Sequence, residues 1–341
     1  MPLPFTEDTL DEYISRPRDC ALKTAREIKG DVLVLGAAGK MGLHLVLMLR
    51  HCFEHNKQKN RVIAVSRFSS SGTRSLFERA GIQTVACDLS DPDELTALPD
   101  VENIWFVAGV KFSSSANLDL LHKMNVEMPR NVARRFKNAR ITALSTGCVY
   151  SFVPTDSSGS AETDPTASDG EYSASCRGRE AAFRNASENE GLRAVLIRLN
   201  YSVEMRYGVL VDIAQRVLSC QPIDISMSRF NCIWQGDAIA HIISASSLAE
   251  SPASTLNVTG PGSHSIRQTA EAFGTLLNKK PVFIGEEQKT TWLNNADKDI
   301  GMFGVPEVTP DMLIEWTAEW LKKGGKTLGK PTKFEVRNGE F

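Results

Sequence analysis

Val32-Leu33-Val34-Leu35-Gly36-Ala37-Ala38-Gly39-Lys40-Met41-Gly42 is the stretch that decides the fold of this chain. Its four apolar residues predict a buried strand, its glycines follow at the spacing G-x-x-G-x-x-G, and a helix is expected directly after them. Gly36 allows a tight turn, Gly39 lets a pyrophosphate approach the backbone, and Gly42 lets the helix pack closely on the sheet. The free N–H groups at the helix start would face the phosphates. The pattern indicates dinucleotide binding, with a chance glycine-rich turn as the alternative.

The composition is that of an ordinary globular protein and excludes several classes of function. The 341 residues suffice for one large domain or two modest ones, and 42% of them are hydrophobic. A net charge of −2 gives no electrostatic footprint for nucleic acid or for an acidic membrane surface. The sequence contains neither an apolar run of membrane-spanning length nor a visible secretory signal. We therefore expect a cytoplasmic protein that binds no nucleic acid and no membrane.

The cysteines and histidines show no metal-binding spacing. The seven cysteines are scattered without a C-x-x-C pair, and the six histidines form neither H-x-x-x-H nor H-E-x-x-H. This usage favours free thiols in a reducing compartment. We expect no protein-bound metal.

Short apolar segments alternate with helical ones over the first two hundred residues. Strands are expected at 31–35, 61–66, 83–86, 103–108, 141–146 and 193–199. Strands of this kind are typical of a parallel sheet covered on both faces, so the pattern predicts an α/β fold with a doubly wound, Rossmann-type sheet. The expected domains are a helical extension over 1–29 (helical from 6 to 29), a dinucleotide-binding domain over 30–199, and a smaller mixed α/β substrate-binding cap over 200–341, partly interleaved with the sheet.

Further motifs follow the glycine loop in a fixed order. They are Asp88-Leu89 after the third strand, Ala108-Gly109-Val110-Lys111 after the fourth, Asn125 in the next helix, Ser145-Thr146-Gly147-Cys148-Val149-Tyr150 at the fifth strand end, and Tyr172 with Glu180 in the helix beyond. In this order the chain resembles the extended short-chain dehydrogenase/reductase superfamily, of the NAD-dependent epimerase/dehydratase type, over roughly residues 30–275. Several ordered matches are far more specific than any one of them.

The resemblance implies a cofactor site and a reaction. The positions expected to contact the cofactor are Gly36, Ala38, Gly39, Lys40, Met41, Gly42, Ser66, Arg67, Asp88, Leu89, Ala108, Gly109 and Asn125. Hydride transfer to and from nicotinamide would act on a sugar or a sugar-derived alcohol. Thr146 would hydrogen-bond the substrate oxygen, and Tyr172 would exchange its proton. The resemblance also implies a possible homodimer.

The end of the second strand favours NADP over NAD. NAD-binding folds of this kind usually carry an acidic residue there, about 20 residues beyond the glycines. This chain has Ser66-Arg67 instead, so no carboxylate repels a 2′-phosphate and Arg67 can bind one through its forked guanidinium. Lys40 adds a second positive group. The alternative is that both are exposed surface charges, which leaves NAD as the second choice.

One residue departs from the family pattern, because Cys176 stands where the family places lysine in the tyrosine helix. In the family that lysine assists the tyrosine, and cysteine is short and a weak donor. Lys111 is the leading substitute for the missing cation. Arg177 and Arg179 are alternatives, but they are expected to point away from the Cys176 face because each helical residue turns by about 100°. Alternatively, the oxidised nicotinamide supplies the charge.

A third interpretation is a nucleotide-binding sensor or scaffold without catalysis. Cys176 itself is counted among the candidate catalytic positions, with a small buried apolar residue as the alternative.

Three residues beyond the sixth strand are candidates for the substrate. Asn200 follows this strand directly, and Arg206 and Arg229 could bind an anionic group such as a carboxylate or phosphate. Each could equally be a surface or packing residue. The stretch 329–337 lies outside the family pattern, and the sequence assigns it no role.

Overall fold

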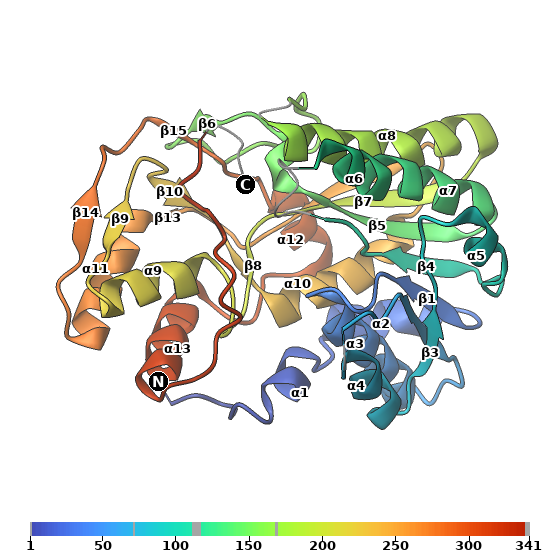
Figure 1. Ribbon diagram of the computed structural model, residues 1–341, viewed down its shortest axis with the longest axis horizontal. Coiled ribbons are helices and arrows are strands. Elements are labelled where there is room, and N and C mark those ends of the chain that lie inside the picture. Colours follow the sequence, from blue (N-terminus) through green and yellow to red (C-terminus); the bar gives the residue numbers. More distant parts are fainter. Residues whose placement is uncertain (1, 71, 111–116, 168–169, 338–341) are drawn as a thin grey trace.

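A seven-stranded parallel sheet forms the centre of the computed structural model, which describes residues 2–70, 72–110, 117–167 and 170–337 (Figure 1). The strand order is β12-β7-β5-β4-β1-β2-β3. The strands are β1 (Val32–Leu35), β2 (Val62–Ser66), β3 (Gln83–Ala86), β4 (Asn103–Phe106), β5 (Arg140–Thr146), β7 (Arg193–Leu199) and β12 (Ser254–Val258). The predicted doubly wound sheet is confirmed, and its first six strands lie within two residues of the predicted segments. The sequence did not reveal β12.

The order of the strands reverses at the centre of the sheet. From β1 the chain builds β2 and β3 on one side and then crosses to β4, β5 and β7 on the other. The chain after β1 leads to one face of the sheet and the chain after β4 to the other, which leaves a crevice at the carboxyl edge, where doubly wound sheets bind ligands.

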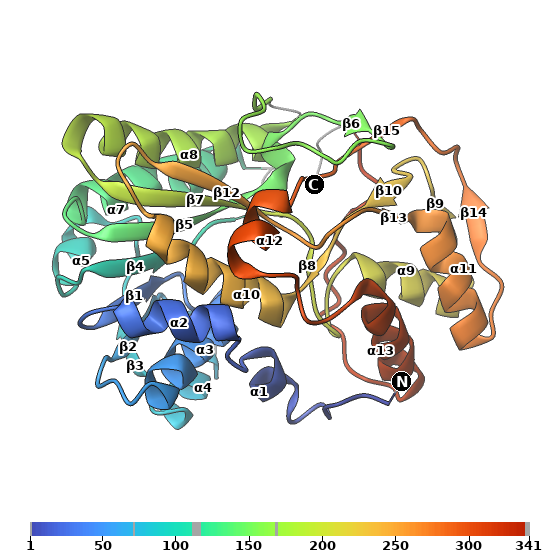
Figure 2. The same cartoon turned by 180° about the vertical axis from the view of Figure 1, so that it is seen from behind.

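Helices cover both faces of the sheet because successive strand residues point to opposite faces and both sets are apolar. Val32 and Val34 face one core, and Leu33 and Leu35 face the other. The first face carries α2 (Asp19–Glu27), α3 (Gly42–His55) and α10 (Gln235–Ser244), and α4 (Thr73–Arg79) lies beside β3 (Figure 2). The second face carries α5 (Pro92–Thr96), α6 (Leu118–His122), the π-helical turn η2 (Lys123–Glu127), α7 (Met128–Arg135) and the long α8 (Glu171–Glu190).

The chain beyond β7 builds a smaller unit and also returns to the sheet. Helices α9 (Val209–Leu218), α11 (Ile266–Leu277) and α13 (Pro310–Lys322) pack together. Paired short strands flank them: β9 (Pro222–Asp224) with β14 (Val282–Ile284), and β10 (Arg229–Phe230) with β13 (His264–Ser265). Between these elements, α10, the 3-10 turn η4 (Ala245–Leu248) and β12 rejoin the sheet, and α12 (Asp297–Phe303) packs on β12.

Three short elements connect the sheet to the cap around the site. The 3-10 turn η3 (Gly147–Val149) follows β5, β6 (Val153–Pro154) pairs with β15 (Thr290–Thr291), and β8 (Ser202–Val203) pairs with β11 (Ile233–Trp234). These pairings hold the cap against the carboxyl edge of the sheet.

The N-terminal extension forms two helices instead of the continuous helical segment expected from 6 to 29. They are α1 (Leu10–Ile14) and α2, and Pro17 lies between them. A proline lacks the N–H that a helix interior needs, and it disfavours helical backbone in the residue before it. Phe5 packs against Trp316 at a ring separation of 5.5 Å, so the extension is joined to the cap.

None of the helices in the described part of the chain is long and apolar enough to cross a membrane.

Candidate cofactor and active site

The glycine loop makes a turn that only glycine can make. Gly36 has a φ of +91°, and a Cβ atom there would lie 2.6 Å from the backbone of Ala108. A Cβ atom at Gly42 would lie 2.2 Å from the carbonyl oxygen of Ala37. The two loops at the switch point are thus held in backbone contact, and α3 starts at once behind the first of them.

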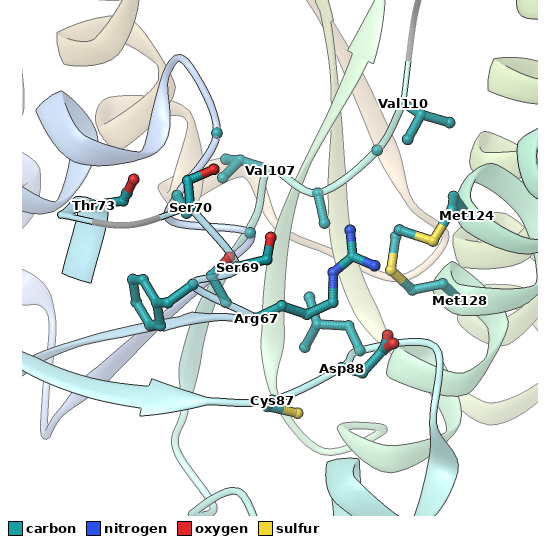
Figure 3. A pocket seen from close by; sticks show the side chains of 18 residues that line it. Arg67, Ser69, Ser70, Thr73, Cys87, Asp88, Val107, Val110, Met124 and Met128 are labelled. Carbon is teal, nitrogen blue, oxygen red and sulfur yellow. The ribbon is translucent and has the colours of Figure 1, made fainter. Parts of the chain in front are cut away.

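A pocket of about 230 Å³ opens at this crevice (Figure 3). Its described lining is Gly36, Ala38, Gly39, Ser66, Arg67, Phe68, Ser69, Ser70, Thr73, Cys87, Asp88, Leu89, Val107, Ala108, Gly109, Val110, Met124 and Met128. Nine of the predicted cofactor positions therefore meet around one cavity, brought there by the ends of β1, β2, β3 and β4. The hydroxyl residues after Arg67 and the methionines of η2 and α7 were not predicted. The serine run was a visible signal, whereas the methionines have the pattern of ordinary helix residues.

Arg67 and Asp88 place opposite charges in this pocket. Figure 3 shows the Arg67 side chain reaching across the cavity towards Met124, with Asp88 beside it. Asp88 Oδ1 accepts hydrogen bonds from the N–H and the hydroxyl of Ser90, at 2.9 and 2.7 Å. Burial opposes ionisation of this carboxyl, but the Ser90 hydrogen bonds and the charge of Arg67 outweigh it and lower the pKa of Asp88.

Two residues of the loop turn away from the pocket. Lys40 Nζ donates to the carbonyl oxygen of Ser202 at 3.0 Å and lies 4.1 Å from the ring centre of Tyr207. Met41 packs against the core and accepts a contact from the Ser202 hydroxyl at 3.5 Å. The expected role of Lys40 as a second positive group at the cofactor is not supported, because its ammonium holds the loop to β8. Lys111 lies outside the described residues.

Asn125 supports the pocket from behind. It is fully buried in η2, and its Oδ1 accepts from the N–H of Val110 at 3.1 Å. Its amide nitrogen donates to the Val110 carbonyl oxygen at 3.0 Å and to Ser175 Oγ at 2.9 Å. Asn125 therefore fixes the loop after β4 to α8 and does not itself line the cavity.

Thr146 and Tyr172 lie outside the described lining of the pocket, at its cap side. Thr146 ends β5, and its Oγ1 accepts from the N–H of Cys148 at 3.2 Å. Tyr172 is the second residue of α8 and packs against a small cluster made by Met227 and Trp292. The two candidate catalytic hydroxyls are thus presented by adjacent elements, the end of β5 and the start of α8.

Cys176 lies one turn after Tyr172 and is fully buried. Burial raises the pKa of the Tyr172 hydroxyl well above its usual range, and the hydrogen-bonded Cys176 thiol and the nearby Cys148 thiol raise it further. Burial also raises the pKa of the Cys176 thiol. Both groups are therefore neutral near pH 7.

Within the described residues, no group of three His, Cys, Asp or Glu side chains is placed to hold a metal ion.

Arg179 is buried on the same face of α8 as Cys176, which corrects the expectation that it points away. Residues three apart are neighbours on a helix surface, because three steps of about 100° per residue place the second side chain close to the first. Its Nη1 donates to the carbonyl oxygen of Leu144 at 3.0 Å, and its Nη2 donates to Asn125 Oδ1 at 2.5 Å. Arg177 is exposed, because it lies only one residue after Cys176 and therefore faces a different side of the helix.

The last residue of the helix motif, Glu180, has a structural role. It accepts from Ser145 Oγ at 2.7 Å, and Arg198 of β7 binds both of its oxygens, at 3.0 and 2.8 Å. Arg198 also donates to the Tyr150 hydroxyl at 2.7 Å. This buried network fixes α8 against β5 and β7, so it sets the position of Tyr172 at the start of the helix.

The candidate substrate residues all have partners within the chain. Asn200 donates to Asn231 Oδ1 at 2.7 Å. Arg206 pairs with Glu204 at 3.1 Å and with Asp11 at 2.7 Å. These carboxylates already neutralise Arg206, so the structure does not support the expected binding of an anionic substrate there.

Arg229 likewise binds within the chain. Its guanidinium donates to the hydroxyl and to the carbonyl oxygen of Ser263, both at 2.8 Å. Its expected role as an anion-binding group is not supported by this placement, because the side chain links β10 to the segment before β13.

The C-terminal segment 332–337, which the sequence left without a role, runs along α9 to the active-site side of the cap (Figure 1). Thr332 is hydrogen-bonded to Asp212 through its N–H and its hydroxyl, at 2.6 and 2.5 Å. Val336 packs on the Met227–Trp292 cluster that Tyr172 also contacts. This segment therefore walls the cap side of the site, an arrangement that no local sequence pattern signals.

Arg337 anchors the end of this segment. It donates to the carbonyl oxygen of Thr290 at 2.7 Å and to the Thr290 hydroxyl at 2.8 Å. Its guanidinium carbon also lies 4.4 Å from the ring centre of Phe152.

Solved structures of other proteins share this fold. DesIV, a dTDP-glucose 4,6-dehydratase from Streptomyces venezuelae solved with NAD, has a TM-score of 0.71 and 18% identity over 86% of this chain and 97% of its own. A variant of UDP-glucuronic acid 4-epimerase from Bacillus cereus, also with NAD, has a TM-score of 0.71 and 16% identity over 86% and 99%. Pal from Bacillus thuringiensis has a TM-score of 0.71 and 19% identity over 86% and 99%. At these identities the likeness shows the fold.

Sequence comparisons identify the family of the chain but no individual relative. A comparison with curated protein sequences gave no significant match. The model of the NAD dependent epimerase/dehydratase family matches residues 32–203, half of the chain. This match includes the glycine loop, the end of β5 and the whole of α8, and it confirms the resemblance seen in the motifs. The chain belongs to the NAD dependent epimerase/dehydratase family.

Proposed function

We propose that this protein is a nicotinamide-dependent oxidoreductase or epimerase that acts on a sugar or a sugar-derived alcohol. The observation that carries the proposal is the pocket at the switch point, where Gly36 and Ala108 meet in backbone contact and leave a cradle that any side chain would fill. Thr146 and Tyr172 flank the same edge of the sheet. A dinucleotide along the pocket would bring its nicotinamide towards these two hydroxyls.

The residues present fit a dinucleotide. The glycine loop and the first N–H groups of α3 would hold the pyrophosphate, Asp88 and Leu89 the adenosine, and the loop at Gly109 the nicotinamide half. When bound, the cofactor would accept or donate a hydride at its nicotinamide ring.

The pocket favours NADP over NAD. The Arg67 side chain reaches across the cavity, and the hydroxyl residues Ser69, Ser70 and Thr73 also belong to its lining. A guanidinium in the pocket suits a 2′-phosphate, whereas the ribose-binding carboxylate typical of NAD sites is missing at the end of β2. This preference would distinguish the protein from the similar structures that were solved with NAD.

The protonation of Tyr172 favours one direction of the reaction. Because its pKa is raised, Tyr172 is a neutral phenol near pH 7. It can therefore donate a proton to the substrate's carbonyl oxygen, which becomes negatively charged when hydride adds to the carbonyl carbon. It accepts a proton only when ionised. Reduction of a carbonyl is therefore expected to proceed at neutral pH, and oxidation of an alcohol is expected to accelerate as pH rises towards the tyrosine pKa.

The substrate would lie between the two hydroxyls and the wall of the cap. Val336 and Tyr172 are partly exposed and pack on the buried Met227 and Trp292. The apolar face of a sugar ring would pack on Val336 and Tyr172 while a hydroxyl of the sugar reaches Thr146.

The test is a fluorescence titration of the purified protein with NADPH and NADH, followed by assays of hydride transfer with a panel of sugar and keto-sugar substrates. Selective NADPH binding with turnover of a panel member is expected. Binding of neither cofactor would overturn the proposal.

A second candidate is a non-catalytic NADP(H)-binding sensor or scaffold, which the neutral Tyr172–Cys176 pair favours. Such a protein would bind NADPH, would transfer no hydride to any panel member, and would gain no activity from Cys176→Lys. Turnover by the wild-type protein would exclude this alternative.

A further inference from the structure

The guanidinium of Arg179 covers the turn of α8 that carries Cys176, the position where the family has a lysine. Long side chains on a helix lean towards its N-terminus, so a residue covers the turn before its own position. Arg179 therefore lies over the turn of Ser175 and Cys176, and its Nη2 binds the same Asn125 side chain that holds Ser175 Oγ.

We propose that Arg179 supplies the fixed positive charge that the family's lysine would otherwise supply, and that it acts as a positioning residue for the nicotinamide half of the pocket. This inference rests on the proposed function, because it concerns the effect of Arg179 on a bound nicotinamide cofactor.

Arg179 lies directly behind the wall of the pocket. A Cβ atom at Gly109 would lie 2.2 Å from Arg179 Nη2, and Gly109 itself lines the cavity. In the described part of the chain, the backbone of Gly109 therefore lies between the guanidinium and the cavity where the cofactor is expected. Through Leu144 and Asn125 the same guanidinium ties the end of β5 and the loop after β4 to α8.

The charge of Arg179 is not neutralised by the groups that hold it. Its two acceptors in the described residues are a carbonyl oxygen and an amide oxygen, and its Nε–H has no acceptor there. Arg198, on the next strand, is by contrast bound by both oxygens of Glu180. A buried and unpaired cation is costly to keep, and an anionic ligand at the neighbouring pocket would offset that cost.

The groups that act on Tyr172 agree with this assignment. Among the described residues, the titratable groups that raise the pKa of the Tyr172 hydroxyl are the thiols of Cys176 on its own helix and Cys148 on η3. The charge of Arg179 lowers the pKa of this hydroxyl and also lowers the pKa of the Cys176 thiol. Asn125 on η2 is an uncharged amide.

A fixed positive charge behind the pocket discriminates between the two redox forms of the cofactor. The oxidised nicotinamide ring carries a positive charge and the reduced ring is neutral. Arg179 should therefore weaken NADP+ binding relative to NADPH binding, which raises the ratio of their dissociation constants. Loss of packing alone would weaken both forms together and leave the ratio unchanged.

The experiment measures both dissociation constants, without substrate, for the full-length wild-type protein, Arg179→Met and Arg179→Lys. The ratio of the NADP+ constant to the NADPH constant is expected to fall on the order of tenfold in Arg179→Met and to stay near the wild-type value in Arg179→Lys at pH 7. An unchanged ratio in a folded Arg179→Met protein that binds both forms would overturn the inference.

A second pair of variants moves the charge to another position. Cys176→Lys added to Arg179→Met restores the family arrangement and should restore the ratio, whereas the matched addition of Cys176→Met should not. A ratio that stays at the Arg179→Met value in both double variants would contradict the charge argument.

The pH dependence of Arg179→Lys keeps the test decisive if Arg179→Met does not fold. A buried lysine has a lowered pKa and loses its charge as pH rises, whereas arginine stays charged. The ratio for Arg179→Lys should therefore fall between pH 7 and about 10 while the wild-type ratio stays constant. A constant ratio in both proteins would overturn the inference. Failure of the wild-type protein to bind either form would instead overturn the proposed function, and this inference with it.

Discussion

The cofactor half of the site is shaped by backbone contacts, whereas the catalytic half is shaped by side chains. Around the glycine loop, the backbone of Gly36 touches the backbone of Ala108, and no side chain can replace either contact. On α8 the site depends on side chains, and there Cys176 and Arg179 lie three residues apart on the same face of the helix. Positions in close backbone contact leave no room for a side chain, whereas a charge on a side chain could be supplied from a neighbouring helical turn.

The largest expected effect is on the catalytic half alone. Tyr172→Phe should lower turnover by about 100-fold or more, because it removes the proton that the reaction exchanges, and should leave the NADPH dissociation constant within about twofold of wild type. Steady-state kinetics and a fluorescence titration measure the two effects. Tyr13→Phe, in the N-terminal extension, is the matched control. Unchanged turnover in Tyr172→Phe would sink the assignment of Tyr172 as the acid/base.

The next effect concerns the backbone contact. Gly36→Ala should weaken NADPH binding on the order of 10- to 100-fold, because the added Cβ pushes the two loops apart. Gly30→Ala is a matched control, since Gly30 also has a positive φ of +68° but its Cβ would meet no atom within 4 Å. Gly30→Ala should lose about 1–3 kcal/mol of stability because of its positive φ, and Gly36→Ala should lose more because its Cβ also clashes with Ala108, both measured by chemical denaturation. Equal NADPH binding by the two variants would show that the contact with Ala108 does not shape the pocket.

A smaller effect separates the two cofactors. Arg67→Gln should weaken NADPH binding about tenfold, through loss of a charge-assisted hydrogen bond of roughly 1.5 kcal/mol, and should change NADH binding less than about twofold. Arg61→Gln, at the other end of β2, should change neither. Parallel losses for NADPH and NADH would mean that Arg67 holds a part that both cofactors share.

The smallest effect tests the wall of the cap. Val336→Ala should raise the KM for substrate about threefold, because it trims the apolar surface shared with Trp292, and it should leave NADPH binding unchanged. Val305→Ala, at a site that is 67% exposed, is the control. A KM equal to that of the control would place the substrate away from the C-terminal segment.

Local pattern predicted the sheet and most of the cofactor half, since strands and glycine turns are encoded within a few residues. It could not predict β12, whose Ser254–Val258 segment is only partly apolar and pairs with a strand far away in sequence. Arg206 was expected to meet a ligand because its partner Asp11 comes from the N-terminal extension. The position of Arg179 beside Cys176 follows from the i, i+3 relation on a helix surface, so the sequence does carry this signal.

The return of the chain from the cap to β12 makes folding of the two units interdependent. A fragment ending at residue 199 would leave β7 as a bare edge and would lose α10, whose ten residues are all buried. Unpaired apolar edges of this kind recruit other chains. The dinucleotide-binding part is therefore expected to aggregate when expressed alone, and the intact chain should unfold in a single cooperative transition in which the cap completes the sheet.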